Sequence, residues 1–421
     1  MLTQNVGFLL YFYALLSEIR YMKLHKILVD AVILALQQIF IEEKYADKVI
    51  ERVLGSNRKW GARDRGFIAE TTYEMVRWWR LIAHCEGDTW RNENGMWRMF
   101  GTWYIMQDII LPAWIEFEGL RPDIIMSRHQ EATSNRALIQ SIPDWIDTLA
   151  SNELGDAWPA ELAAMNTSAP VILRANTLKT NALFLKESLF ASGIETEMVT
   201  DVPTALRLQK RQNVFSTEQF KNGLFEVQDG GSQLIGSFLD VKPGLRVVDA
   251  CAGAGGKTLQ LAAAMQNKGQ LIALDVEGYK LEELKRRAKR AGVGNVETRI
   301  IESTKTIKRL YDSCDRLLLD VPCSGLGVLR RNPDAKWKLQ AEFIEKIKQT
   351  QREILTTYPK MLRVGGLMVY ATCSILPSED ERQIEWFLNQ NSDFNLIKDQ
   401  RTSVADTGFD GFYMALLQKK K

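Results

Sequence analysis

Two cysteines, Cys323 and Cys373, are the side chains best suited to covalent chemistry, because each follows a short apolar run closely. The chain has five cysteines, no Cys-x-x-Cys spacing and only three histidines, so neither a disulfide framework nor a zinc site is indicated. The pattern is typical of a reducing compartment, and we expect a cytoplasmic protein without a metal. A thiol acts as a nucleophile through its thiolate. One buried cysteine is usually inert packing, but two at strand ends favour reactive thiols.

A glycine-rich loop lies within residues 247–258 (VVDACAGAGGKT), in the strand–loop–helix order with which α/β proteins bind nucleotides. It is not a P-loop, because Cys251 occupies the position of the first glycine. It is not a dinucleotide loop starting at Gly253, because Thr258 occupies the position of the third glycine. The loop suits an adenosine-containing ligand whose tail need not be a phosphate, such as S-adenosylmethionine. The alternative is a glycine-rich turn that binds nothing.

Four apolar runs end at side chains that can bind or react, namely Asp249, Asp275, Asp320 and Cys373. Short all-apolar runs indicate strands buried on both faces of a parallel sheet. Ligands bind beyond the carboxyl ends of such strands, so we expect these side chains to form one site. Asp275 can accept hydrogen bonds from both ribose hydroxyls, or it can cap the helix expected to begin near Gly278. Glu302, after the next apolar stretch, is a candidate for the adenine edge.

Three segments of the chain resemble the signature motifs of one enzyme family. They are residues 249–258 (DACAGAGGKT), 320–337 (DVPCSGLGVLRRNPDAKW) and 370–381 (YATCSILPSEDE). The family is RsmB/Sun (Fmu), whose members are RNA cytosine-5 methyltransferases that use S-adenosylmethionine. Residues 225–233 (FEVQDGGSQ) resemble the family's segment before the first strand, and the resemblance covers about residues 170–417. The chain departs from the pattern at Ala254, where many members have proline, and at Glu302, where many have aspartate.

The resemblance implies a chemical role for both thiols. Cytosine C5 is a poor nucleophile, and a thiolate that adds at C6 turns C5 into an enamine-like carbon able to attack a sulfonium methyl group. The resemblance assigns this nucleophile to Cys373, and proton removal with enzyme release to Cys323. It places Asp320 at cytosine N3 and lets Lys257 organise the cytosine and the catalytic groups. The cofactor-binding residues it implies are Cys251, Ala252, Gly253, Ala254, Gly255, Gly256, Lys257, Asp275, Glu302 and Asp320.

The expected substrate is a specific cytosine of ribosomal RNA, in the 16S small-subunit RNA, which must be unpaired or flipped to reach such a pocket. Three alternatives remain open: the same chemistry on transfer RNA, a non-catalytic RNA-binding ribosome-assembly factor, and a DNA-type methyltransferase with Cys323 as nucleophile. The intact reactive residues argue against the non-catalytic alternative. The second cysteine and a helical N-terminal domain favour RNA over DNA.

The fold class expected is α/β, a Rossmann-like methyltransferase domain with a mainly parallel seven-stranded sheet, in residues 231–421. An all-α domain is expected in residues 22–150, because Arg63–Glu70 and the residues after it resemble a NusB-like RNA-binding domain. A small α/β, RRM-like subdomain is expected in residues 165–230. Residues 1–21 would be an extra segment, explained either by a misassigned start or by an additional helix packed on the NusB-like domain. Its apolar run is too short to span a bilayer, and no basic segment precedes it.

The net charge is only +2, so RNA binding would depend on local basic patches. The candidates are Arg330, Arg331, Lys336 and the tail residues 419–421. The many tryptophans between Trp60 and Trp145 are expected in the core of the helical domain rather than on a base-stacking surface. No heptad repeat indicates a coiled coil, and we expect a monomer that has no contact with a membrane.

Overall fold

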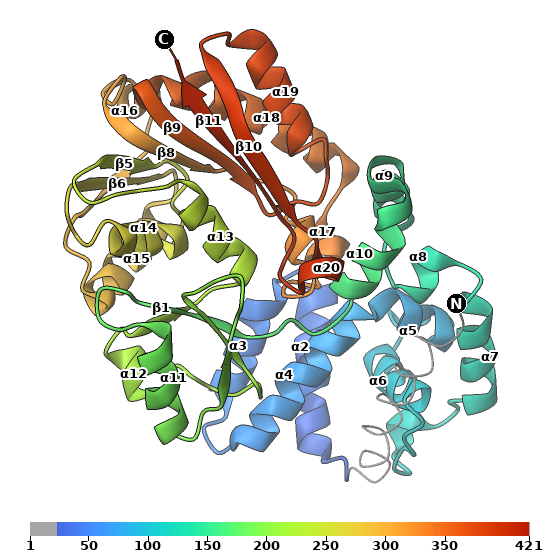
Figure 1. Cartoon of the computed structure of the whole chain (residues 1–421). Coiled ribbons are helices and arrows are strands. Elements are labelled where there is room, and N and C mark those ends of the chain that lie inside the picture. The colour runs from blue at the N-terminus through green and yellow to red at the C-terminus, as the bar shows by residue number, and fades with distance from the viewer. Residues whose placement is uncertain (1–22, 421) are drawn as a thin grey trace. The chain divides into compact units, whose positions relative to one another are not determined.

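The computed structural model describes residues 23–420, and the expectation for residues 1–21 lies outside them. The chain divides into two compact units (Figure 1). The first, called here the helical unit, comprises Met1–Leu149 and Asn332–Leu339, and the second, the sheet unit, comprises Ala150–Arg331 and Gln340–Lys421. Each unit is described by itself.

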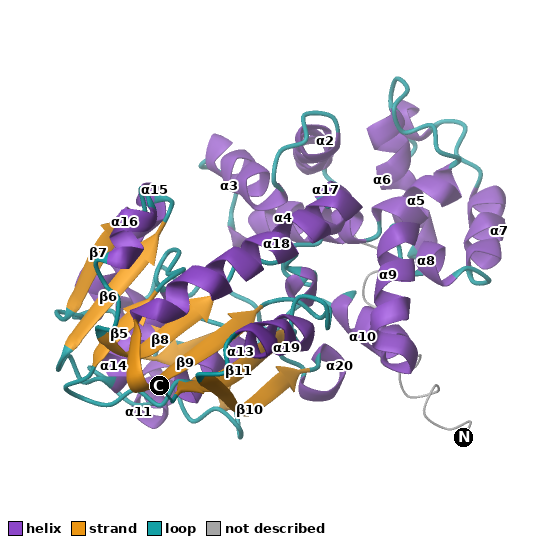
Figure 2. Cartoon of the chain, turned by 90° about the horizontal axis from the view of Figure 1, so that it is seen from above, coloured by secondary structure: helices purple, strands orange, loops and turns teal. Residues whose placement is uncertain are grey.

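The helical unit contains no strand within the described residues 23–149 and 332–339, as Figure 2 shows by colour. Its longer helices are α2 (Lys26–Phe40), α3 (Ala46–Ser56), α4 (Ala62–Arg77), α5 (Trp79–Glu86), α6 (Gly95–Met106) and α7 (Pro122–Ala132). The shorter elements are η1 (Ile115–Phe117), α8 (Arg136–Ile139) and α17 (Ala335–Lys338). Helix α9 (Asp144–Leu154) crosses from this unit into the next.

Aromatic side chains fill the core of the helical unit. Trp79 stacks on Phe40 with ring centroids 3.6 Å apart, and Trp90 meets Trp79 edge to face at 5.1 Å. Five further tryptophans are partly buried against this cluster, namely Trp60, Trp78, Trp97, Trp103 and Trp114. The expectation that the tryptophans belong to the core is therefore confirmed for these residues.

Helix α17 lies in the helical unit, although it belongs to the second of the three family-like segments. The Trp337 indole donates a hydrogen bond to the Val76 carbonyl oxygen at 2.7 Å, and Asp334 accepts one from the Ala46 amide at 3.0 Å. Residues 332–339 begin twelve positions after the strand-end residue Asp320 in the sequence.

The sheet unit begins with η2 (Gly155–Ala157) and α10 (Trp158–Met165), followed by a four-stranded antiparallel sheet in the order β2-β3-β1-β4. Its strands are β1 (Ile172–Ala175), β2 (Thr196–Met198), β3 (Ala205–Leu208) and β4 (Phe225–Val227). Helices α11 (Ala182–Ala191) and α12 (Glu218–Lys221) cover one face of it.

The second sheet has seven strands in the order β10-β11-β9-β8-β5-β6-β7, with β11 antiparallel to both of its neighbours, β10 and β9 (Figure 1). The strands are β5 (Arg246–Asp249), β6 (Gln270–Asp275), β7 (Val296–Ile300), β8 (Cys314–Asp320), β9 (Leu362–Thr372), β10 (Phe394–Thr402) and β11 (Phe412–Lys419). The fold class predicted from the sequence is confirmed. Since β5, β6, β8 and β9 are parallel neighbours, their carboxyl ends meet at one edge.

Helices cover both faces of this sheet. One face packs on α13 (Gly230–Phe238), α14 (Gly256–Ala264) and α15 (Gly278–Ala291). The other face packs on α16 (Thr304–Lys308), α18 (Ala341–Thr357) and α19 (Glu381–Gln390). Three short elements complete the unit: η3 (Leu326–Val328), η4 (Tyr358–Met361) and α20 (Val404–Thr407). Burial on both faces explains why the central strands are continuous apolar runs.

Candidate active site

The glycine-rich loop turns sharply between β5 and α14. Gly255 caps α14 with φ of 86°, and a Cβ there would come within 2.5 Å of the Leu284 side chain. Gly253 also has a positive φ, 53°. The positive φ favours glycine at both positions, and at Gly255 the lack of space for a Cβ favours it as well. The loop backbone follows the sequence expectation of a tight turn at the end of a buried strand.

Asp275, at the end of β6, joins this loop to the start of α15. Its Oδ2 accepts a hydrogen bond from the Gly253 amide at 2.8 Å, and its Oδ1 accepts one from the Glu277 amide at 2.8 Å. The N-cap of α15 is Glu277, so Asp275 precedes the cap position. A carboxylate oxygen can accept more than one hydrogen bond, so each oxygen keeps capacity for a further donor.

A cavity of about 620 Å³ opens at this edge of the sheet. Of the predicted cofactor residues, four line it: Cys251, Gly253, Asp275 and Asp320. The cavity is not lined by Ala252, Ala254, Gly255, Gly256, Lys257 or Glu302, and Glu302 is exposed to solvent. The backbone groups of several of these residues are instead bonded within the protein, such as the Ala252 amide to the Leu274 carbonyl oxygen at 2.9 Å.

Sequence reasoning missed the opposite wall of this cavity. Helix α18 and the turn after it contribute Glu353, Ile354, Thr357 and Tyr358. The apolar and aromatic part of this wall and the carboxylate of Asp275 are the combination that an adenosine needs, one for the base and one for the ribose. The residues present therefore fit S-adenosylmethionine. Only the helical periodicity of 341–357 could have pointed to this wall, and that pattern does not say which face meets a ligand.

Asp249, at the end of β5, is a second acid beside the loop. Its Oδ2 accepts a hydrogen bond from the Thr258 hydroxyl at 2.7 Å, while its Oδ1 is buried and has no hydrogen-bond partner among the described residues. Burial raises the pKa of Asp249 to about 7. An unpartnered buried carboxylate oxygen next to the glycine loop is consistent with a site for a polar or cationic group of a ligand.

The two predicted thiols lie side by side at the ends of β8 and β9. The sulfur atoms of Cys323 and Cys373 are 3.3 Å apart, and both cysteines are free and partly buried. The hydrogen bond with Cys373 raises the pKa of Cys323 well above its ordinary value, and burial raises it further. Cys323 is therefore a neutral thiol at neutral pH. The other buried cysteines, Cys85 and Cys314, have no such partner thiol in the described part of the chain and occupy apolar clusters.

Lys257 and Asp320 form an ion pair beside the thiols. The Lys257 ammonium donates a hydrogen bond to Asp320 Oδ2 at 2.7 Å, and both side chains are largely buried. Burial lowers the pKa of Lys257, but the charge of Asp320 and the hydrogen bond to it more than compensate, so the net pKa lies above the ordinary value. Lys257 therefore carries a fixed positive charge at the strand ends. The structure thus brings together all four predicted catalytic residues around the same edge.

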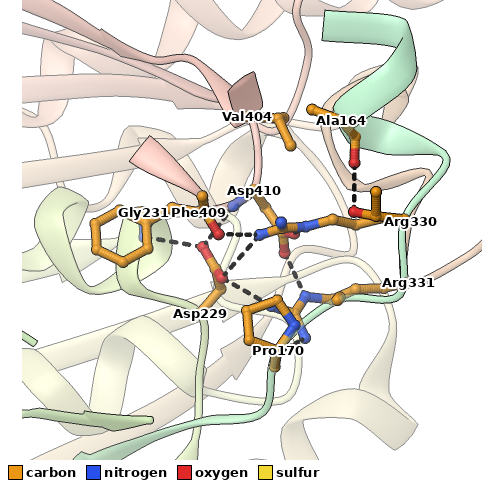
Figure 3. Close-up of polar contacts among 12 residues, drawn as sticks. Ala164, Pro170, Asp229, Gly231, Arg330, Arg331, Val404, Phe409 and Asp410 are labelled. Atoms are coloured by element: carbon orange, nitrogen blue, oxygen red, sulfur yellow. Dashed lines mark hydrogen bonds and ion pairs between the residues drawn. The ribbon is translucent and has the colours of Figure 1, made fainter. Parts of the chain in front are cut away.

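Of the basic residues expected on an RNA-binding patch, Arg330 and Lys336 are buried, so the prediction is wrong for these two, while Arg331 and Lys419 are partly buried, Lys420 is exposed and Lys421 lies outside the described residues. Arg330 pairs with Asp410 at 2.6 Å, and Arg331 pairs with Asp229 at 2.7 Å and with Asp410 (Figure 3). Lys336 lies within the helical unit and is only 2% exposed. In the tail, Lys419 pairs with Asp312 at 2.8 Å. A count of basic residues in sequence does not distinguish a solvated charge from one that neutralises a buried acid.

Among the described residues, 23–420, no group of three or more histidine, cysteine or acidic side chains could hold a metal ion. Across the same part of the chain, no helix combines the length and the apolar character that crossing a bilayer requires.

The seven-stranded sheet with a glycine loop after β5 and an acid at the end of β6 is the fold of Rossmann-like S-adenosylmethionine-dependent methyltransferases. The chain belongs to the RsmB/F family of ribosomal RNA small-subunit methyltransferases. A family profile described as "16S rRNA methyltransferase RsmB/F" matches residues 237–418. A second profile, for the ferredoxin-like domain of RsmF/B-like methyltransferases, matches residues 142–215.

Named relatives agree with this family. A probable ribosomal RNA small subunit methyltransferase B of Synechocystis is 33% identical over 298 residues, which is 66% of this chain and 67% of the relative. Ribosomal RNA small subunit methyltransferase B of Pasteurella multocida is 36% identical over 66% of this chain and 65% of the relative. The matches thus span about two thirds of the relatives' length. A solved methyltransferase homologue from Pyrococcus horikoshii has a TM-score of 0.61 and 27% identity, covering 68% of this chain and 98% of that one.

Proposed function

We propose that this protein transfers the methyl group of S-adenosylmethionine to C5 of a specific unpaired cytosine in 16S small-subunit ribosomal RNA. The observation that carries the proposal is the pair of thiols, Cys323 and Cys373, with sulfur atoms 3.3 Å apart beside the Lys257–Asp320 ion pair. The names of the relatives support the ribosomal substrate. A substrate of that kind would place the enzyme in the cytoplasm.

In the first step, the Cys373 thiolate bonds to C6 of the cytosine, and C5 becomes nucleophilic. Electron density moves toward the N3 side of the ring, where Asp320 would lie. The Lys257 ammonium, which Asp320 holds through a hydrogen bond, can stabilise the negative charge that develops on the ring. S-adenosylmethionine, when bound in the cavity that Asp275 and Asp320 line, supplies the electrophilic methyl group.

The second thiol becomes useful only after the first has reacted. In the resting protein the hydrogen bond with Cys373, followed by burial and by the charge of Cys373, keeps Cys323 protonated. Once Cys373 is bonded to C6 it is a neutral thioether, so the effects of its hydrogen bond and its charge end and the pKa of Cys323 falls. Cys323 can then lose its proton to solvent and remove the proton from C5. The electron pair of that C–H bond restores the C5–C6 double bond and expels Cys373.

The test is methyl transfer from labelled S-adenosylmethionine to unmodified small-subunit ribosomal RNA, followed by mapping of 5-methylcytosine. We expect label at one cytosine with the wild-type protein and none with Cys373→Ala. Label that appears only in transfer RNA would overturn the substrate. Tight RNA binding without any methyl transfer would overturn the reaction and support a non-catalytic RNA-binding factor.

A further inference from the structure

A buried carboxylate that the mechanism above does not use, Glu379, lies behind the two thiols. It is fully buried, just before α19. Its Oε2 accepts hydrogen bonds from the Ser324 amide at 2.8 Å and from the Gln351 side chain at 3.0 Å. Its Oε1 accepts one from the Ser374 hydroxyl at 2.7 Å. Glu379 therefore bonds to the residue that directly follows each cysteine.

The two cysteine loops are matched copies at the ends of adjacent parallel strands. Each has the sequence Cys-Ser, at residues 323–324 and 373–374. The sulfur atoms are 3.3 Å apart and the serine hydroxyl oxygens 3.2 Å apart. Strands β8 and β9 end in register just before them, with Asp320 beside Ala371. Beyond that pair the two loops are joined by backbone hydrogen bonds such as that from the Gly327 amide to the Cys373 carbonyl oxygen at 2.9 Å, and a group that bonds to both serines would fix their spacing further.

Gln351 strengthens the hold on the first loop. Its side-chain nitrogen donates both to Glu379 Oε2 and to the Pro322 carbonyl oxygen at 3.0 Å, which is the residue directly before Cys323. The hydroxyl of Tyr370 in β9 donates to the Glu379 carbonyl oxygen at 2.7 Å, which anchors Glu379 to the strand that leads into the second loop. Glu379 is thus connected to the chain before and after each of the two cysteines, either directly or through Gln351.

We propose that Glu379 is a positioning residue that holds the Cys323 and Cys373 loops at the separation the two-thiol reaction needs. The inference rests on the proposed function for its catalytic meaning, but the geometry it invokes is measurable without RNA. Glu379 accepts all three of these hydrogen bonds, two at Oε2 and one at Oε1, so a side chain without acceptors cannot replace it. An error of about 1 Å in the placement of a reacting group costs on the order of a hundredfold in rate.

The main variants are Glu379→Leu and Glu379→Gln. Leucine fills a similar volume and accepts no hydrogen bond, so both loops lose their tether, and we expect kcat to fall about a hundredfold with little change in KM for RNA. Glutamine keeps one acceptor oxygen for the Ser324 amide, and its NH2 group can donate to the Ser374 hydroxyl. We therefore expect Glu379→Gln to recover about tenfold of that loss. If Glu379 only fills space, the two variants should behave alike.

The matched control is Glu381→Gln, which removes the same charge two residues away. Glu381 accepts hydrogen bonds from Arg401 at 2.6 and 2.8 Å, and this partner belongs to β10 rather than to either cysteine loop. Its kcat should stay within about twofold of wild type. Binding of S-adenosylmethionine and the thermal midpoint should be near wild type in each variant that folds.

A second readout needs neither RNA nor cofactor. Diamide, an azo oxidant, takes one hydrogen from each of two neighbouring thiols and leaves a disulfide and a hydrazine. In wild type the Cys323–Cys373 disulfide should form quickly, because the sulfur atoms need to move only about 1 Å to reach bonding distance. Mass spectrometry of the linked peptides should show closure at least about tenfold slower in Glu379→Leu and unchanged in Glu381→Gln.

The outcomes separate the two ideas. If Glu379→Leu kept both the wild-type rate of disulfide closure and the wild-type kcat, the positioning role would be overturned. A second outcome is slow disulfide closure in that variant together with a wild-type enzyme that does not methylate cytosine. This outcome would overturn the proposed function but support the positioning role. Should Glu379→Leu fail to fold, Ser374→Ala decides, since it removes one bond to Oε1. Unchanged closure and kcat in Ser374→Ala together with Glu379→Gln would overturn the proposal.

Discussion

Two buried carboxylates, Asp275 and Glu379, each hold two segments of chain at the same edge of the sheet. Asp275 accepts from the Gly253 and Glu277 amides, and Glu379 accepts from Ser324, Gln351 and Ser374. Asp275 is 8% exposed and lines the cavity, whereas Glu379 is fully buried and does not. At the cofactor end of the site, Asp275 thus keeps capacity to accept hydrogen bonds from a ligand. At the thiol end, Glu379 contacts only protein.

The largest effect should come from the thiol end. Cys373→Ala should abolish both methylation and covalent capture of RNA, because it removes the thiol assigned to add at C6 and Cys323 is assigned only to proton removal. Cys323→Ala should let the adduct form and then stall it, because the C5 proton stays in place. The measurement is a protein–RNA band that survives denaturing electrophoresis, present in Cys323→Ala and absent in Cys373→Ala. The reverse pattern would show the DNA-type arrangement, with Cys323 as the nucleophile.

At the cofactor end the expected effect is smaller. Asp275→Ala should weaken binding of S-adenosylmethionine about tenfold or more, since hydrogen bonds to a charged group contribute roughly 1.5–3 kcal/mol each. The variant also frees the Gly253 amide, which adds to the loss. Calorimetry gives the affinity, with Glu282→Gln on the exposed side of α15 as control. Unchanged affinity in a folded Asp275→Ala protein would remove Asp275 from the site.

The sequence predicted the strands and the residues at their ends because both depend on local patterns. Short apolar runs mark strands that are buried on both faces, and parallel strands bring their ends together. This reasoning placed Asp275, Asp320, Cys323 and Cys373 correctly at one edge. The roles assigned to these residues stay predictions.

Features that depend on which way a side chain turns were not visible in the sequence. Within Ser378–Glu381 three acids stand in a row, and nothing in their order shows that Glu379 faces the cysteine loops while Glu381 faces Arg401. The repeated Cys-Ser dipeptide was the available signal for a shared tether. Likewise, charge alone made Arg330 and Arg331 candidates for an RNA-binding surface. In the structure these side chains are mostly buried and pair with Asp410 and Asp229.

A titration of Cys323 would sharpen the view of the thiol end. The hydrogen bond with Cys373 raises the pKa of Cys323 first, burial adds to this, and the charge of Cys373 raises it further. Cys373→Ala removes the first and third causes, so Cys323 should become alkylated by iodoacetamide at lower pH than in wild type. The yield at the Cys323 peptide, followed by mass spectrometry across pH 6–10, gives both midpoints. Equal midpoints would mean that burial alone sets the pKa and that Cys373 does not control the second thiol.

The smallest expected effect concerns stability at the cofactor end. Burial raises the pKa of Asp249 to about 7 from an ordinary value of 3.8, so the folded state favours the protonated acid. The stability gained from this preference is complete below pH 3.8 and is lost as the pH rises through 7. Asp249→Asn stays neutral and can keep the hydrogen bond from Thr258. Its unfolding free energy should therefore increase relative to that of wild type between pH 5 and pH 8. We expect a gain on the order of 1–3 kcal/mol.

The measurement for Asp249 is urea unfolding at several pH values, without cofactor. The control is Asp240→Asn, at an acid whose side chain is 59% exposed and whose charge costs the fold little. Wild type and Asp240→Asn should follow the same pH dependence, while Asp249→Asn diverges upward. If all three curves run parallel, Asp249 is ionised throughout, and the neighbouring Lys257 then compensates its charge in the fold. In that case Asp249 at the cofactor end would resemble Glu379 at the thiol end. Its charge would be stabilised by the protein alone, and it would not be available to a ligand.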